Sequence, residues 1–94
     1  MLAVRDYLTV EKIGYEDGVY FTMEVYKLSD GGFRCHGYAM ASGVKITDWD
    51  YFAVDMEDAY SELTRDYLVR ELRPLAKQQL EHLGRIALRW GIPQ

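Results

Sequence analysis

Cysteine and proline are almost absent from this 94-residue chain, and it contains no long apolar run. The single cysteine, Cys35, excludes a disulfide within the chain, which is typical of proteins from a reducing compartment. Proline stands only at positions 74 and 93, and no linker divides the sequence. No stretch approaches the roughly 20 apolar residues of a membrane span, and the first residues lack a secretory signal pattern. We therefore expect one domain over residues 1–94, located in the cytoplasm and not in a membrane.

Charge is unevenly distributed along the chain. Residues 1–64 hold twelve acidic and five basic side chains, a net charge of −7, whereas residues 65–94 hold six basic and three acidic ones, a net charge of +3. The acidic part argues against a phosphate backbone docking there, because nucleic-acid affinity comes largely from lysine and arginine. The basic C-terminal part leaves nucleic-acid binding open as an alternative function.

A β-hairpin is predicted over residues 19–41 from alternation and turn chemistry. Residues 19–28 alternate apolar and polar side chains almost perfectly, which is typical of a half-buried strand. A three-residue loop over 29–31, with Gly31 in the left-handed conformation, sets the register of this hairpin. The opposed pairs are then Val25–Cys35, Met23–Gly37 and Phe21–Ala39.

A second hairpin is predicted between residues 7–13 and 19–28. A four-residue loop from Tyr15 to Gly18 would place Leu8 opposite Val25 and Val10 opposite Met23. Together the strands form an antiparallel meander with one apolar and one mixed face. Its predicted inner face carries Leu8, Val10, Phe21, Met23, Val25, Phe33, Cys35 and Ala39. Its predicted outer face carries Tyr7, Thr9, Glu11, Ile13, Tyr20, Thr22, Glu24, Tyr26, Arg34, His36, Tyr38 and Met40.

Residues 42–54 fit two structures. Gly43 ends the third strand, and residues 44–46 can form another. The stretch 48–54 is compatible with a fourth strand or with the start of a helix, because Trp49, Phe52 and Met56 recur at nearly helical spacing. We leave both open.

Helical structure is predicted from Asp55, a candidate N-cap followed by acidic residues in the first turn. Two apolar stripes follow, about 150° apart on a straight helix. Pro74 lies near the change between them, so we expect a bend or break there that gives two helices. The alternative is one long kinked helix whose distal half packs on a partner. The first stripe is Met56, Ala59, Tyr60, Leu63 and Tyr67; the second is Leu68, Leu72, Leu75, Ala76, Leu83, Ile86, Ala87 and Trp90.

The sequence therefore predicts an α+β fold. A three- or four-stranded antiparallel β-meander is followed by two C-terminal α-helices packed on one sheet face.

No motif points to catalysis, a metal or a cofactor, and we expect none of the three. Glu24 and His36 face each other in the predicted register, so a small enzyme or ligand binder using this pair is an alternative. Cys35 neighbours His36 in a strand, so their side chains point to opposite faces and Cys35 is expected in the core. The spacing of His36 and His82 matches no zinc site, and the acidic run 48–58 lacks the glycine and final glutamate of a calcium loop.

The aromatic outer face is the strongest functional indication. Helices can cover only one face of a small sheet, and exposed apolar patches usually mark contacts. We expect a non-enzymatic protein–protein interaction module whose partner is a protein target, a second copy, or both. The predicted partner-binding residues are Tyr7, Tyr20, Tyr26, Arg34, His36, Tyr38 and Met40, with Leu72, Leu83 and Trp90 as a secondary interface.

Three short stretches lie within a region that covers about half of the chain: Glu16-Asp17-Gly18-Val19-Tyr20, then Gly37, then Asp55-Met56-Glu57-Asp58-Ala59. In this outline the chain resembles the HicB-type antitoxin domain. The longer strands and residues 49–54 depart from that pattern. In size and acidity the chain also looks like small phage-encoded inhibitors such as anti-CRISPRs. An inhibitor or antitoxin-like protein that blocks a larger target through its aromatic sheet face and acidic surface would fit the composition of this face and the charge of the chain.

Overall fold

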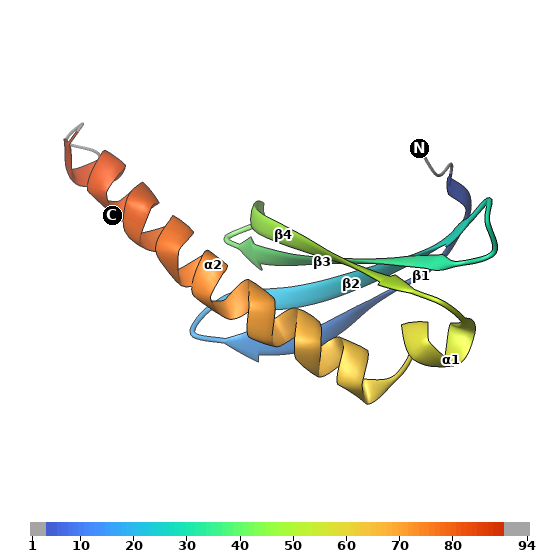
Figure 1. The fold of residues 1–94 in the computed structure, drawn as a ribbon. Helices are drawn as coiled ribbons and strands as arrows, with labels where there is room; N and C mark the ends of the chain where they lie inside the picture. The colour runs from blue at the N-terminus through green and yellow to red at the C-terminus, as the bar shows by residue number, and fades with distance from the viewer. Residues whose placement is uncertain (1–3, 90–94) are drawn as a thin grey trace.

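The structure is a computed structural model that describes residues 4–89, with side-chain surroundings for residues 7–84. One antiparallel sheet contains β1 (Val4–Glu16), β2 (Val19–Leu28), β3 (Phe33–Ala41) and β4 (Val44–Ala53) in sequence order. The short helix α1 (Met56–Ala59) leads into α2 (Glu62–Arg89), which lies along one face of the sheet (Figure 1). The predicted α+β meander with C-terminal helices on one face is confirmed. Of the two structures left open for residues 48–54, the strand is the one formed, as far as residue 53.

The β2–β3 hairpin has the predicted register. Met23 is paired with Gly37, and Phe21 with Ala39. Gly31 adopts a φ of +94°, and its N–H donates to the carbonyl of Leu28 over 3.1 Å. The left-handed glycine closes the three-residue loop and thereby sets the register of both strands.

The predicted register of the first hairpin is wrong. Its turn contains two residues, Asp17 and Gly18, with φ values of +51° and +83°, which suit the type I′ turn that favours Asp-Gly. Irregularities along β1 shift the pairing further, so that Thr9 lies opposite Val25 and Glu11 opposite Met23. Tyr7 stays on the predicted outer face, but the shift between Tyr7 and Thr9 exchanges the two faces in the residues that follow. Leu8 and Val10, predicted inside, are exposed; Thr9 and Glu11, predicted outside, share the face of the core strands, and Ile13 packs against the core.

The core lies between the inner face of the sheet and the first half of α2. Leu68 and Leu72 are fully buried, and they sit directly over Gly37. A Cβ atom at Gly37 would come 3.1 Å from Cδ2 of Leu68 and 3.2 Å from Cδ1 of Leu72. The missing side chain at this position lets the helix approach β3 closely. The buried apolar residues are Val19, Phe21, Met23, Val25, Phe33, Cys35, Ala39, Ala53, Ala59, Leu68, Leu72 and Ala76.

The two helices separate at residues 60–61 and α2 is continuous through Pro74, so the predicted break there is wrong, and the helix runs on as in the alternative. Asp55 caps α1 as predicted, since its carboxylate accepts from the N–H of Asp58 over 2.8 Å. The hydroxyl of Ser61 accepts from the N–H of Thr64 over 3.1 Å and so caps α2. From there α2 continues through Pro74. Pro74 is exposed, so water can satisfy the carbonyl that the missing N–H leaves without its helical partner.

The early break also changes the first apolar stripe. Met56 and Leu63 are exposed, the latter at 81%. Ala59 is buried, and Tyr60 and Tyr67 pack against the core. Because the helical spacing is interrupted at residues 60–61, the five predicted positions do not share one helix face.

The second half of α2 extends past the end of the sheet that carries the turns after β1 and β3 (Figure 1). The radius of gyration is 15.3 Å, with extents of 49 × 26 × 17 Å. A compact chain of this length has a radius of gyration of roughly 12 Å. The molecule is therefore elongated along its helix. Within residues 4–89, no helix combines the length and apolar composition needed to span a bilayer.

Candidate functional site

The face of the sheet opposite α2 is the candidate site, and we call it the outer face. No helix of the described chain lies on it (Figure 1). Strand pairing places two tyrosine pairs there, Tyr7 opposite Tyr26 and Tyr15 opposite Tyr20. The outer face is defined by Tyr7, Val10, Lys12 and Tyr15 of β1, Tyr20, Thr22, Glu24 and Tyr26 of β2, Arg34, His36, Tyr38 and Met40 of β3, and Lys45, Asp48, Asp50 and Phe52 of β4.

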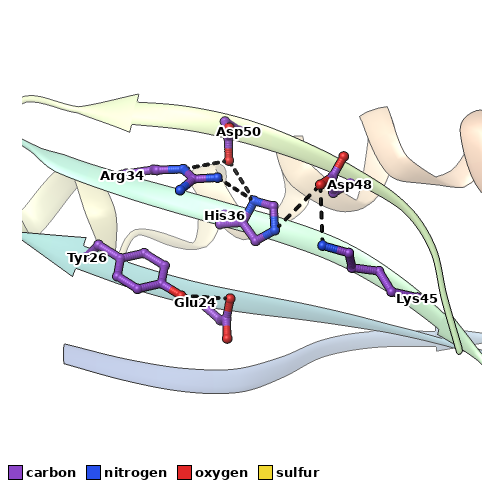
Figure 2. A network of polar contacts seen from close by, with 7 residues as sticks. All are labelled: Glu24, Tyr26, Arg34, His36, Lys45, Asp48 and Asp50. Carbon is purple, nitrogen blue, oxygen red and sulfur yellow. Dashed lines mark hydrogen bonds and ion pairs between the residues drawn. The ribbon is translucent and has the colours of Figure 1, made fainter. Parts of the chain in front are cut away.

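A polar network on β3 and β4 holds the imidazole of His36 at the centre of this face (Figure 2). Nδ1 of His36 lies 2.7 Å from Oδ1 of Asp50, and Nε2 lies 3.7 Å from Oδ2 of Asp48. Arg34 donates its Nε–H to the same oxygen of Asp50 over 3.1 Å. Nη2 of Arg34 also lies 3.2 Å from Nδ1, and one ring nitrogen cannot both accept from Arg34 and donate to Asp50. Because the contact with Asp50 is the shorter and an ionised carboxylate can only accept, the geometry favours a proton on Nδ1. The largely buried ring of His36 therefore joins β3 to β4 by a hydrogen bond to the carboxylate of Asp50, with Asp48 as a longer contact.

The carboxyl group of Asp50 is stabilised in its charged form. Partial burial acts to raise the pKa of Asp50, but hydrogen bonds from His36 and Arg34 outweigh it and hold that pKa below its ordinary value. Lys45 approaches the neighbouring carboxylate of Asp48 over 3.5 Å. The two acidic groups of β4 thus have basic partners on the same face.

Glu24 does not pair with His36, although the two residues are opposed in the β2–β3 register. Its carboxylate accepts instead from the hydroxyl of Tyr26 over 3.0 Å (Figure 2). Burial, the hydrogen bond to Glu24 and the charge of Glu24 raise the pKa of Tyr26. Burial and nearby Glu24 also raise the pKa of Tyr38. Both phenols therefore stay neutral and remain hydrogen-bond donors at physiological pH.

The tyrosines are arranged in close pairs with exposed edges. The ring centroids of Tyr7 and Tyr26 are 5.2 Å apart, and those of Tyr15 and Tyr20 are 4.6 Å apart. The ammonium group of Lys12 lies 4.6 Å from the centroid of the Tyr20 ring. These contacts hold the rings in place but do not bury them, since Tyr7 is 51% and Tyr20 44% exposed.

The imidazole of His36 is enclosed by its neighbours. Nδ1 is hydrogen-bonded to Asp50, Nε2 lies 3.7 Å from Asp48 and the ring is buried, so a substrate has little access to it. Among the described side chains, no three metal-binding residues come together. Cys35 lies on the opposite face, where its thiol contacts the carbonyl of Ala59 over 3.6 Å. Burial, with a smaller effect of the Asp58 charge, raises the pKa of Cys35 to about 11, which disfavours the reactive thiolate.

All seven residues predicted to bind a partner lie on the outer face. The sequence analysis missed Val10 and Tyr15, because the first hairpin was placed in the wrong register. It also missed Asp48 and Asp50, because the strand character of residues 48–53 was left undecided. The alternation of these two acids with Trp49 and Tyr51 was the signal that could have placed Asp50 opposite His36.

The predicted secondary interface is only partly accessible. Leu72 is fully buried in the core, which is incompatible with direct binding to a partner, whereas Leu83 is 41% exposed. Trp90 lies outside the described residues. The basic residues of α2 are partly engaged within the molecule: Arg65 donates to Glu11 over 2.6 Å, and Arg73 donates to Glu16 over 2.6 Å. These ion pairs reduce the basic surface on which nucleic-acid binding through α2 would depend.

Comparisons with known proteins give no identification. No protein-family model matches the sequence, and neither the curated proteins nor the solved structures contain a match. The outline resemblance to antitoxin domains stays an expectation from the sequence. Any statement of function must therefore come from the geometry of the chain itself.

Proposed function

We propose that this protein is a non-enzymatic interaction module that binds a larger protein target through its outer face. The observation that carries the proposal is the set of half-exposed tyrosines on a sheet face that α1 and α2 leave uncovered. Tyrosine and arginine are enriched at the centres of protein interfaces, because they offer apolar area together with a hydrogen-bonding group. The proposed contact residues are Tyr7, Tyr20, Tyr26, Arg34, His36, Tyr38 and Met40.

The polar network supports this role because it makes the face rigid. Asp50 joins Arg34 and His36, so the central side chains are already ordered before a target arrives. Ordering side chains on binding costs about 0.5–1.5 kcal/mol for each flexible one, and a preorganised face avoids part of that cost. The flat mixture of rings and paired charges suits a protein surface better than a small ligand, which needs a concave pocket.

Blocking a basic groove of the target is the proposed mode of inhibition. On the outer face itself, Lys12, Arg34 and Lys45 balance three acidic residues. Acidic residues gather instead where the β2–β3 loop meets the β4–α1 junction, close to Gly32 and Ala53. They are Asp30, Asp55, Glu57 and Asp58. Complementary charge at this end would speed association with a basic target. A cytoplasmic location forms part of the proposal and is compatible with the single free cysteine.

The test is target capture followed by a direct binding measurement. Wild-type protein is used to isolate a target from its host, and the affinity of the purified pair is measured by calorimetry. Tyr7→Ser with Tyr20→Ser should weaken binding at least ~tenfold, because truncated interface tyrosines commonly cost more than 1 kcal/mol each. Both rings are more than 40% exposed, so the double variant should keep the fold.

Leu63→Ser is the matched control, because it removes an exposed apolar side chain from α2, away from the outer face. It should bind the target as wild type does. Unchanged affinity in the double tyrosine variant, with its circular dichroism spectrum intact, would refute the proposal.

A further inference from the structure

The apolar stripe of α2 continues beyond the core that it helps to build. Leu68, Leu72 and Ala76 recur every four residues and are buried on the sheet. Leu80 and Leu83 continue this spacing past the end of the sheet, and they are 40% and 41% exposed. A helix in water gains little stability unless its apolar face is covered. The stripe therefore has a covered half and an uncovered half.

A groove begins where the covered half ends. It has a volume of about 340 Å³ and lies between α2 and the β1–β2 hairpin. Val19 and Phe21 contribute apolar surface from the hairpin, and Ala76 and Leu80 contribute it from the helix. The groove is thus continuous with the exposed leucines, so one apolar segment could cover both.

Two opposite charges lie on the same side of the helix, next to the exposed stripe at Lys77 and further round at Glu81, and they are self-complementary. Lys77 and Glu81 lie one helical turn apart, are both exposed, and form no ion pair within the described part of the chain. In an antiparallel pair of identical helices, residues before the two-fold axis face residues after it. Lys77 then lies beside Glu81 of the partner subunit, and the reverse contact forms by symmetry. A parallel pair would instead oppose lysine with lysine and glutamate with glutamate.

We propose that α2 pairs with α2 of a second copy of this chain, antiparallel and across a two-fold axis close to Leu80. Leu80 packs against Leu80 of the partner subunit, and Leu83 reaches the groove beside Ala76 of the partner subunit. The stretch from Ala76 to Arg89 is about 20 Å long at 1.5 Å per residue, so the interface is small and the dimer is of about micromolar affinity or weaker. This inference is independent of the proposed function, since it does not use the outer face.

Analytical ultracentrifugation of the full chain tests the proposal, at concentrations from about 5 μM to about 0.5 mM, which bracket the expected range of dissociation constants. Wild-type protein should pass from monomer to dimer. Leu80→Asp with Leu83→Asp should weaken association at least ~tenfold, because two leucines lose their apolar contacts and two charges from each chain enter the interface. Leu63→Asp, which changes an exposed leucine outside the stripe, is the matched control and should dimerise as wild type does.

Charge reversal tests the antiparallel arrangement without removing an apolar side chain. Lys77→Glu alone and Glu81→Lys alone should each weaken association about threefold at low salt, and the two changes together should restore it. Tyr7→Ser with Tyr20→Ser should leave association unchanged. A wild-type chain that stays monomeric over the whole range, association that survives the two aspartates, or a double charge reversal that fails to recover would each overturn the proposal.

Discussion

Asp50 gives a quantitative test of the polar network on the outer face. Asp50→Asn keeps the shape of the side chain but removes the charge that accepts hydrogen bonds from His36 and Arg34. Hydrogen bonds to charged groups contribute about 1.5–3 kcal/mol, but the carboxylate is 35% exposed and solvent screening reduces this. We expect a loss of about 1 kcal/mol at pH 7, seen as a melting temperature lower by about 4–8 °C.

The contribution of Asp50 to the free energy of unfolding should depend on pH in a defined direction. Because the pKa of Asp50 is lower in the folded protein than its ordinary value of 3.8, the charged form favours folding. Its contribution is fully present above that ordinary value and is lost as the pH falls through the lower folded value. The difference between wild type and Asp50→Asn should therefore begin to shrink as the pH falls below 3.8 and vanish once the pH lies below the folded value. Urea denaturation at several pH values measures this difference in the free energy of unfolding.

Asp48→Asn is the control for this experiment. Its carboxylate is on the same strand and face, but it is 53% exposed and its contacts are 3.5 and 3.7 Å long. Asp48→Asn should lower the free energy of unfolding by less than about 0.5 kcal/mol. An equal effect of both substitutions, or a loss at Asp50 that persists unchanged at pH 3, would refute the reasoning.

Other parts of the fold give further predictions. Gly37→Val should destabilise the protein by about 2 kcal/mol or more in thermal unfolding, because its side chain would overlap Leu68 and Leu72 in a filled core. Gly84→Ala, with open space around its Cβ, should instead stabilise α2 by about 0.5–1 kcal/mol, and a destabilisation there would contradict the helix. Cys35 should react with iodoacetamide at pH 8 at least ~hundredfold more slowly in the folded protein than in urea, and similar rates would contradict its burial and raised pKa.

Local turn chemistry was enough to predict part of this fold. The β2–β3 register follows from one left-handed glycine, Gly31, in a loop of defined length. The same rule applied to Asp17 and Gly18 would have given the correct two-residue turn. The register irregularities of β1 could not be predicted from turn chemistry, because they accompany contacts with residues of α2 that are distant in sequence. Glu11 faces inward to meet Arg65, and Gly14 lies close to Val69, so the faces of β1 depend on a helix that pattern analysis of β1 alone does not include.

The candidate site was predictable in its aromatic part and not in its polar part. Tyr20, Tyr26 and Tyr38 belong to strands whose alternation is clear in the sequence. The partners of His36 come from β4, whose residues also fit a helical spacing, so its carboxylates could not be assigned to either face. The helix break was misplaced for a similar reason. Pro74 is the strongest local signal, but an exposed proline is tolerated, and the cap formed by Ser61 decides where α2 begins.

α2 is attached to the two edges of the sheet by different kinds of contact, so the two attachments differ in their sensitivity to salt. Beside β4 the helix is held by aromatic contacts, with the rings of Tyr51 and Tyr67 5.6 Å apart. Beside β1 it is held at Arg65 and Arg73 by ion pairs that ions in solution can screen. Raising the ionic strength should therefore weaken the contacts beside β1 more than those beside β4, while the buried side chains of Leu68 and Leu72 keep the helix on the sheet.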